Sequence, residues 1–238
     1  MTNRSNHCTA IVLSGGQGKR MGSNIAKQYL ELNGKPIIWY SMAAMQKSEF
    51  IDDIVLVIRP EDETLVMNEV LNDNSFIKPV RIAYAGNERY ESVWNGLKLI
   101  FDDSAPKPDY VFIHDGARPF VSEEIIKRNY EGVIEHGACV SAVKSKDTVK
   151  IVDEDGCIIS TPDRNTVWNM QTPQSFEAQL IYSAYKKAIE SKKTYFTDDA
   201  MMVEEFTDKS VFVALGDYRN IKITTPDDLL SAENFFNK

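Results

Sequence analysis

A glycine-rich turn followed by cationic side chains stands near the start of the chain, directly after a short apolar run. Gly15, Gly16 and Gly18 allow the backbone to come close to a ligand, so that several N–H groups can point at one anion. Arg20 and Lys27 follow and can neutralise phosphate oxygens, arginine as a rigid fork and lysine as a point charge. The stretch therefore predicts a polyphosphate site.

Neither of the two standard phosphate-loop patterns fits this stretch. Lys19, Arg20 and Met21 follow Gly18, so the Gly-Lys-Ser/Thr ending of a Walker loop is missing. The glycine spacing matches the dinucleotide fingerprint only loosely, and no acidic residue ends an obvious second strand. A strand-to-helix turn with incidental surface charges is the alternative interpretation. The cations that follow the glycines favour the phosphate site.

A second polar motif directly follows an apolar run, and it reads His114-Asp115-Gly116-Ala117-Arg118-Pro119. Asp115 is a natural Mg²⁺ ligand, because hard divalent ions take carboxylate oxygens and share the rest of their shell with substrate phosphates. A turn-forming aspartate is the alternative for an isolated Asp-Gly pair. The pairing with Arg118 and with the distant glycine loop favours a functional role for Asp115, whereas His114 is expected to be structural.

The elements that must position these motifs alternate between strand and helix through the first 140 residues. Apolar runs predict strands at residues 54–58, 80–84 and 110–113, and helical spacing predicts helices over residues 61–71 and 92–100. This alternation indicates an α/β, Rossmann-like, mostly parallel sheet with helices on both faces. Ligands of such sheets bind beyond the carboxyl ends of the strands, where both motifs lie. We therefore expect one site that combines residues 14–20 with Asp115.

The pattern changes after residue 138. Residues 138–143 predict another strand, residues 147–152 alternate between polar and apolar, and residues 153–156 form a hairpin turn signal before a return strand. The following stretch, residues 163–176, is polar and aromatic and shows no clean period. A hairpin added to an almost complete sheet is expected to protrude and to pair with another subunit, although a simple edge hairpin is the alternative. We predict a single domain over residues 1–238 with a dimerisation arm at about residues 144–172.

Composition narrows the class of protein. A chain of 238 residues suits one α/β domain, and its formal net charge of −8 disfavours nucleic acid as a partner. No run approaches the roughly 18 apolar residues of a membrane span, and the first eight residues lack the apolar core of a secretory signal, so the expected location is the cytoplasm. The three cysteines are widely spaced and are interpreted as buried or incidental thiols.

Taken together, these motifs resemble the 2-C-methyl-D-erythritol 4-phosphate cytidylyltransferases of isoprenoid biosynthesis, over nearly the whole chain. No single motif is decisive, but their joint order is highly specific. The resemblance is carried by residues 15–21, 27–29, 91–97, 114–119, 146–150, 164–176, 197–200 and 220–224. It implies an enzyme that joins CTP to a polyol phosphate and releases pyrophosphate.

The resemblance also implies roles for individual residues. Arg20 and Lys27 would stabilise charge on the triphosphate, Asp115 would hold Mg²⁺ or another divalent cation, and Lys222 would contact the α-phosphate and the incoming phosphate. The residues implied in nucleotide binding are Ser14, Gly15, Gly16, Gly18, Gly86, Asn87, Ser92, Gly116, Ala117 and Arg118. In the family, the arm crosses a homodimer interface, so that residues matching Thr148 and Arg164 grip the polyol phosphate in the partner's site, with Arg164 counted among the catalytic residues.

Some residues depart from the family's usual pattern. Ala26 stands where proline usually precedes Lys-Gln-Tyr, Ser14-Gly15-Gly16 stands where alanines are more usual, and Gly116 replaces an alanine. Three alternatives stay open: a ribitol-5-phosphate cytidylyltransferase that makes CDP-ribitol, a non-catalytic nucleotide-binding relative, and a sugar-1-phosphate nucleotidyltransferase. The last of these does not account for the hairpin and its Arg164 motif.

Overall fold

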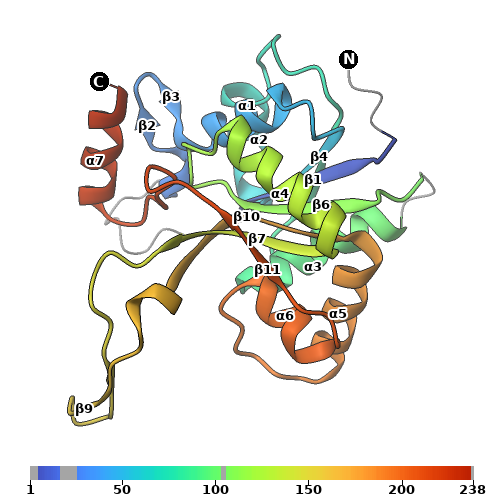
Figure 1. Cartoon of the computed structure of the whole chain (residues 1–238). Coiled ribbons are helices and arrows are strands. Elements are labelled where there is room, and N and C mark those ends of the chain that lie inside the picture. Colours follow the sequence, from blue (N-terminus) through green and yellow to red (C-terminus); the bar gives the residue numbers. More distant parts are fainter. Residues whose placement is uncertain (1–4, 17–25, 103–105, 237–238) are drawn as a thin grey trace.

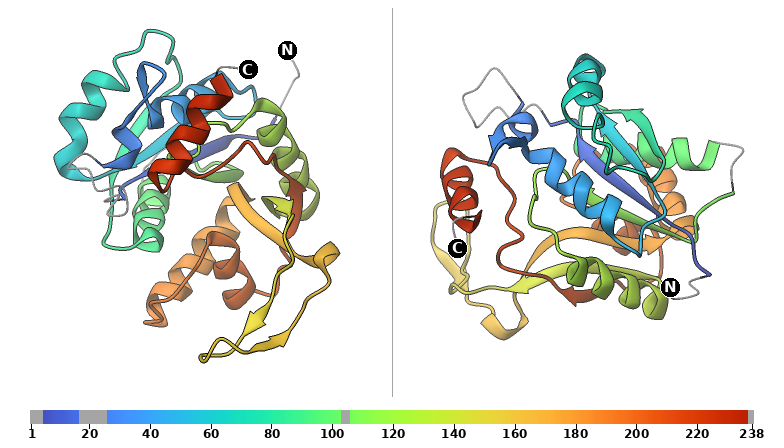
Figure 2. Two further views of the ribbon diagram at one scale, coloured as in Figure 1. Left: turned by 90° about the vertical axis from the view of Figure 1, so that its left-hand side faces the viewer. Right: turned by 90° about the horizontal axis from the view of Figure 1, so that it is seen from above.

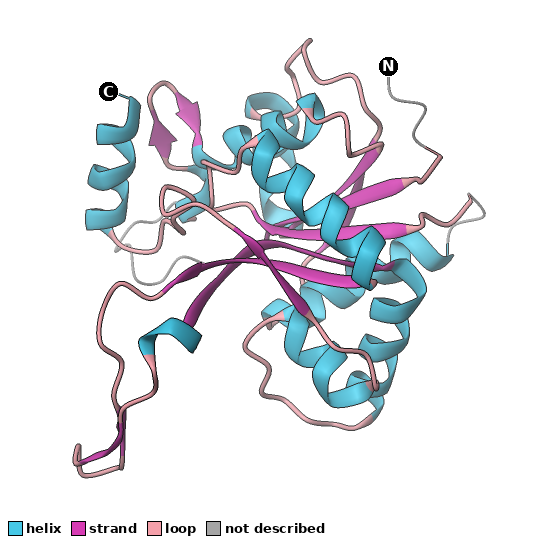
Figure 3. Cartoon of the chain, viewed as in Figure 1, coloured by secondary structure: helices cyan, strands magenta, loops and turns pink. Residues whose placement is uncertain are grey.

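A seven-stranded sheet forms the centre of the molecule (Figures 1 and 3). The computed structural model describes residues 5–16, 26–102 and 106–236. The strand order is β11-β7-β10-β6-β1-β4-β5, and neighbours run parallel except β10, which is antiparallel to both β6 and β7. The strands are β1 (Cys8–Ser14), β4 (Asp53–Ile58), β5 (Val80–Tyr84), β6 (Tyr110–Asp115), β7 (Ala138–Lys144), β10 (Trp168–Glu177) and β11 (Phe212–Leu215). The predicted α/β, mostly parallel sheet is confirmed.

Helices cover both faces of this sheet (Figure 2). One face packs against α1 (Ile37–Lys47), α2 (Glu63–Glu69) and α4 (Glu123–His136). The other face packs against α3 (Arg89–Asp102), α5 (Ala178–Glu190) and α6 (Asp199–Phe206). In α3, where a helix over residues 92–100 was predicted, the apolar stripe of Val93, Leu97 and Ile100 is buried against the sheet, because residues spaced by three and four share one side of a helix. Burying each such side chain stabilises the fold by about 1.5–3 kcal/mol.

Helix ends follow local capping chemistry. The Ser122 side chain accepts a hydrogen bond from the backbone N–H of Ile125 and starts α4. Gly137 ends this helix with a φ of 78°, in the left-handed region that glycine enters without steric cost. The helix predicted over residues 61–71 divides into a 3-10 turn, η3 (Pro60–Asp62), followed by the shorter α2.

The C-terminal segment returns to the first third of the chain. Helix α7 (Pro226–Phe236) lies beside a small antiparallel pair formed by β2 (Glu31–Leu32) and β3 (Lys35–Pro36), as Figure 1 shows. Leu32, Ile37, Ile223 and Ala232 form the buried cluster that joins them. Within the described part of the chain, no helix is long and apolar enough to cross a membrane.

The predicted hairpin projects away from the sheet and the helices (Figure 1). Its paired part is short and consists of β8 (Ile151–Val152) and β9 (Ile158–Ser160). Strand β8 is shorter than the alternation over residues 147–152 predicts. Four apolar side chains of this arm are 46–65 % exposed: Ile151, Val152, Ile158 and Ile159. The 3-10 turn η4 (Arg164–Thr166) leads from the arm back into β10.

Candidate active site

The carboxyl ends of β1, β5 and β6 open onto a cleft of about 890 Å³. The predicted site residues that line it are Gly15, Gly16, Lys27, Gly86, Asn87, Ser92, Asp115, Ala117 and Lys222. Of the other predictions, Ser14, Gly116 and Arg118 are sequence neighbours of these lining residues, whereas Gly18 and Arg20 lie outside the described part of the chain. The structure thus brings residues from both ends of the chain into one cleft.

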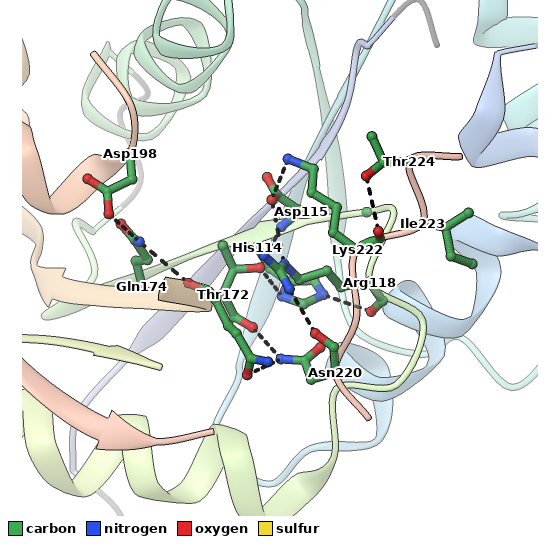
Figure 4. A network of polar contacts seen from close by, with 12 residues as sticks. His114, Asp115, Arg118, Thr172, Gln174, Asp198, Asn220, Lys222, Ile223 and Thr224 are labelled. Atoms are coloured by element: carbon green, nitrogen blue, oxygen red, sulfur yellow. Dashed lines mark hydrogen bonds and ion pairs between the residues drawn. The ribbon is translucent and has the colours of Figure 1, made fainter. Parts of the chain in front are cut away.

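Among the described residues, three cations surround the Asp115 carboxylate in the cleft, and Figure 4 shows two of them, Lys222 and Arg118. Lys222 Nζ lies 2.9 Å from Asp115 Oδ2, Arg118 Nε lies 3.7 Å from the same oxygen, and Arg89 Nε lies 3.3 Å from Oδ1. Burial by itself would raise the pKa of the Asp115 carboxyl, but the charges of Arg89, Lys222 and Arg118 outweigh burial and hold the pKa well below its usual range. Asp115 is therefore ionised at any physiological pH.

The start of the glycine loop is fixed by Gln28, which the sequence analysis did not single out. Gln28 is buried in η2 (Lys27–Tyr29), and its Nε2 donates hydrogen bonds to the carbonyl oxygens of Ser14 (2.7 Å) and Gly16 (2.9 Å). The Ser14 hydroxyl in turn donates to the Tyr29 hydroxyl at 3.1 Å. The only signal for Gln28 in the sequence was its place directly after the predicted site residue Lys27, in the Lys-Gln-Tyr motif.

The start of α3 fixes the conformation of the predicted nucleotide-binding residues Gly86, Asn87 and Ser92. The Ser92 hydroxyl accepts a hydrogen bond from the backbone N–H of Gly86 at 3.1 Å. Glu91 Oε2 accepts from the backbone N–H groups of Asn87 (2.7 Å) and Glu88 (3.2 Å). These bonds hold residues 86–88 in one conformation along the wall of the cleft.

Glycine is required where the loop after β1 meets this wall. A Cβ atom on Gly15 would lie 2.3 Å from Ala85 Cβ, and a Cβ atom on Gly116 would lie 2.2 Å from Ile38 Cδ1 and 2.7 Å from the Leu13 carbonyl oxygen. None of these three distances is compatible with an alanine in the present backbone. At position 116, where the family usually has alanine, Ile38 and the Leu13 carbonyl oxygen thus leave space only for glycine.

His114 lies in a buried network behind Asp115. The Thr172 hydroxyl accepts a hydrogen bond from the Asp115 backbone N–H and donates one to His114 Nδ1 at 3.0 Å. On the other side of the ring, His114 Nε2 donates to the Arg118 carbonyl oxygen at 3.3 Å. Burial lowers the pKa of His114 to about 4, because the cost of burying the charged imidazolium outweighs the opposite effect of the neighbouring Asp115 charge. The imidazole is therefore neutral at pH 7, with Nε2 carrying the proton, and it supports the turn that carries Asp115.

Arg118 connects this turn to the C-terminal segment. Its guanidinium donates a hydrogen bond of 2.8 Å to the Asn220 carbonyl oxygen. The Asn220 side chain donates at 2.8 Å to the carbonyl oxygen of Thr172 on β10. The segment that carries Lys222 is thereby fixed against the sheet although it forms no regular strand.

The two predicted polyol-phosphate residues lie elsewhere. Thr148 and Arg164 are exposed on the arm and do not line the cleft of their own chain. Arg164 opens η4, which the Asp163 side chain caps by accepting from the Asn165 backbone N–H. A single chain therefore holds the nucleotide part of the predicted site without the part assigned to the arm.

The carboxylate of Asp115 leaves room for a divalent cation. Two carboxylate oxygens offer about four acceptor positions, and the three cations around Asp115 do not use all of them. Among the described residues, no group of three or more His, Cys, Asp or Glu side chains could hold a metal ion by itself. Any ion at Asp115 would need most of its ligands from phosphate oxygens, which is the usual situation for Mg²⁺.

Comparisons with known proteins agree with this geometry. The family model described as "IspD: 2-C-methyl-D-erythritol 4-phosphate cytidylyltransferase" matches residues 8–238. A protein of that name from Lachnospira eligens is 46% identical over 93% of this chain and 95% of its own length. One from Clostridium botulinum is 44% identical over 97% of this chain and 99% of its own length.

Solved structures are similar over nearly the whole chain as well. The 4-diphosphocytidyl-2C-methyl-D-erythritol synthase of Anaerococcus prevotii superposes with a TM-score of 0.86 at 34% identity, covering 98% of this chain and 97% of the other. A 2-C-methyl-D-erythritol 4-phosphate cytidylyltransferase of Francisella tularensis reaches a TM-score of 0.74 at 30% identity, with 96% and 99% coverage.

Proposed function

The chain belongs to the 2-C-methyl-D-erythritol 4-phosphate cytidylyltransferase family, and on this premise we propose how its cleft carries out the reaction. The protein is a cytidylyltransferase that transfers CMP from CTP to 2-C-methyl-D-erythritol 4-phosphate and releases pyrophosphate. The full-length relatives support this acceptor over the ribitol 5-phosphate alternative, and they support an enzyme over a non-catalytic relative. The roles of individual residues, the metal and the assembly are our proposals.

The observation that carries the mechanism is the cationic cluster of Arg89, Arg118 and Lys222 around Asp115, beside the glycine loop. CTP lies in the cleft with its triphosphate along the loop after β1 and its base against residues 86–88. Backbone N–H groups of Gly15 and Gly16 approach the phosphates, and the small glycines keep this approach open. Gly86, Asn87 and Ser92 read the cytosine, while Gly116, Ala117 and Arg118 shape the turn beneath it.

The chemical step requires little proton transfer. An oxygen of the polyol phosphate attacks the α-phosphorus in line, a new P–O bond forms, and the bond to pyrophosphate breaks with its electron pair leaving on the pyrophosphate. Lys222 contacts the α-phosphate and the incoming phosphate, while Lys27 and Arg20 neutralise the charge that grows on the leaving group. Catalysis then depends on positioning and charge, as expected for phosphoryl transfer.

We propose that Asp115, together with phosphate oxygens of CTP, would hold a divalent cation such as Mg²⁺. It supplies Lewis-acid stabilisation of the phosphates. Asp115 also holds Lys222, since its Oδ2 lies 2.9 Å from the ammonium group. One carboxylate thus has two tasks in the proposal, orienting the lysine and sharing the metal.

The arm completes the site of a second copy. Thr148 and Arg164 are exposed on a projection that carries four exposed apolar side chains, a composition that favours burial against another subunit. We propose a homodimer in which the arm of one chain brings these two residues to the polyol phosphate in the partner's cleft. We also propose a cytoplasmic location, in keeping with two charged, water-soluble substrates.

The experiment that tests the function measures pyrophosphate release from CTP and Mg²⁺, with 2-C-methyl-D-erythritol 4-phosphate and ribitol 5-phosphate offered in parallel. We expect a strong preference for the methylerythritol substrate. A preference for ribitol 5-phosphate would overturn the proposed acceptor, and no release with either substrate would overturn the proposed reaction.

A further inference from the structure

An ion pair between a partly exposed arginine and a fully buried aspartate lies beside the Asp115 carboxylate and joins two helices. Arg89, the first residue of α3, directs its two terminal nitrogens at Asp199 at 2.9 and 2.7 Å, while its Nε lies 3.3 Å from Asp115 Oδ1. Asp199 is the first residue of α6 and is fully buried. One guanidinium thus connects a carboxylate of the cleft with a carboxylate that solvent does not reach.

Asp199 is held by neighbours outside the cleft. Its backbone N–H and that of Ala200 both donate to Gln174 Oε1 at 3.0 Å, so the first turn of α6 is fixed to strand β10. The Tyr185 hydroxyl of α5 donates to Asp199 Oδ1 at 2.5 Å. Both the backbone and the carboxylate of Asp199 are therefore restrained, and the residue can act as a rigid anchor for Arg89.

The geometry suggests what this anchor prevents. Arginine prefers a bidentate contact with a carboxylate, and here Asp199 receives that contact while Asp115 receives only the longer Nε contact. If Asp199 lost its charge, the guanidinium could turn both terminal nitrogens onto Asp115. Arg89 would then compete with Lys222, whose ammonium group lies 2.9 Å from Asp115 Oδ2.

We propose that Asp199 and Arg89 are positioning residues of the transfer reaction. Asp199 holds the Arg89 fork in place, so that Asp115 keeps one oxygen directed at Lys222 in the cleft. Both residues act through Asp115 and not on the reacting phosphates. The inference rests on the proposed function, in which Lys222 contacts the phosphates that react.

Four variants test the inference in steady-state assays of the full-length enzyme. Asp199→Asn keeps the shape and removes the charge, Arg89→Lys keeps the charge and removes the fork, and the double variant combines them. Tyr185→Phe is the matched control, because it removes a hydrogen bond to Asp199 but leaves both charges. We expect kcat to fall about tenfold or more in Asp199→Asn, the KM for CTP to change by less than about threefold, and Tyr185→Phe to stay within about threefold of wild type.

The double variant gives the decisive comparison. If Asp199 acts through Arg89, the double variant is no slower than Arg89→Lys alone, whereas independent structural effects multiply. In ¹H–¹⁵N spectra, the Arg89 Nε–H signal should resist exchange in wild type and in Tyr185→Phe and should exchange rapidly in Asp199→Asn. Turnover of Asp199→Asn equal to that of Tyr185→Phe, or losses that multiply in the double variant, would overturn the inference.

Two further results would also decide the inference: failure of Asp199→Asn to fold, and the activity of Lys222→Ala. If Asp199→Asn does not fold, Arg89→Lys alone decides, and unchanged kcat in that variant overturns the inference. Lys222→Ala separates this inference from the proposed function. Full turnover of Lys222→Ala would refute the proposed role of the lysine, whereas an inactive Lys222→Ala together with a fully active Asp199→Asn would refute only the positioning role.

Discussion

Lys27 Nζ donates a hydrogen bond of 2.8 Å to the carbonyl oxygen of Ile223, a residue 196 positions further along the chain. The bond ties the segment after the glycine loop to the segment that carries Lys222. The two proposed catalytic lysines are therefore placed relative to each other by a contact between Lys27 and the residue next to Lys222. The buried cluster around Ile223 and Ile37 supports the same junction.

Lys27→Ala should lower kcat far more than it changes the KM for either substrate. In the proposed mechanism the lysine stabilises charge that grows on the leaving pyrophosphate, so its loss should destabilise the transition state more than the ground state. We expect a loss of kcat of about 100-fold or more, in line with the removal of one charge-stabilising donor. Steady-state kinetics check this, with Lys186→Ala on the exposed side of α5 as the control. Turnover close to that of the control would contradict the charge-stabilising role.

Gln28→Leu should destabilise the protein and weaken CTP binding. The side chain is 2 % exposed, and its amide donates to the carbonyl oxygens of Ser14 and Gly16. Leucine removes the amide donor from both carbonyls, so that among the described side chains the Ser14 carbonyl keeps only the long 3.5 Å contact with the Tyr29 hydroxyl. Weakening the hydrogen bonding of this buried carbonyl costs about 1–3 kcal/mol, whereas the exposed Gly16 carbonyl can bond to water. Urea unfolding measures the loss, and the KM for CTP reports the loosened loop. The exposed Gln179→Leu serves as the control, and equal stability of both variants would show that these bonds do not hold the loop.

Arg164→Ala should raise the KM for the polyol phosphate and leave the KM for CTP nearly unchanged, because arginine binds phosphate as a bidentate fork. In the proposed dimer the arm completes the partner's site. Mixing inactive Lys222→Ala chains with Arg164→Ala chains should therefore restore activity at polyol-phosphate concentrations too low for Arg164→Ala alone to turn over. In a randomly mixed dimer population, up to about a quarter of the wild-type sites are intact. Mixed dimers verified by mass spectrometry but without recovered activity would indicate that each site is built from one chain.

His114 predicts how stability depends on pH. Burial lowers the pKa of His114 to about 4, below that of an exposed histidine, so the unfolded chain binds a proton more readily than the folded chain between about pH 6.5 and pH 4. The contribution of neutral His114 to the free energy of unfolding is fully present above pH 6.5. It decreases as the pH falls, by about 3 kcal/mol at pH 4.

Urea unfolding at several pH values measures this dependence. His114→Gln keeps a side chain that can donate to the Arg118 carbonyl oxygen and does not titrate. Its stability should therefore decrease less steeply over this pH range than that of the wild type. Parallel pH profiles for the two proteins would contradict a buried, neutral His114.

The residues in the cleft were largely predictable, because their chemistry is local. Glycines, cations and a carboxylate directly after apolar runs mark the carboxyl ends of parallel strands, and the structure brings Gly15, Lys27, Asp115 and Lys222 into one cleft. Gln28, Arg89 and Asp199 were not predicted as site residues. Their roles depend on partners that are distant in sequence, such as the 110 positions between Arg89 and Asp199.

Strand β10 shows the same limit for the fold. Residues 163–176 have no clean period in the sequence, yet Trp168–Glu177 forms a central strand between β6 and β7. Its residues 171–176 are buried and include polar side chains. Most of their hydrogen-bond partners lie on other segments of the chain. Periodicity cannot signal such a strand, because neither face is solvated.

The sequence by itself determined the α/β class, the projecting hairpin and the chemical types gathered at the strand ends, since these follow from local propensity and hydrophobic pattern. Only the tertiary structure decided which charges meet, as in the contacts of Asp115 with Arg89 and Lys222. The physical reason is that the strength of an ion pair depends on distance and burial. Both quantities are set by packing between segments that are remote in the chain.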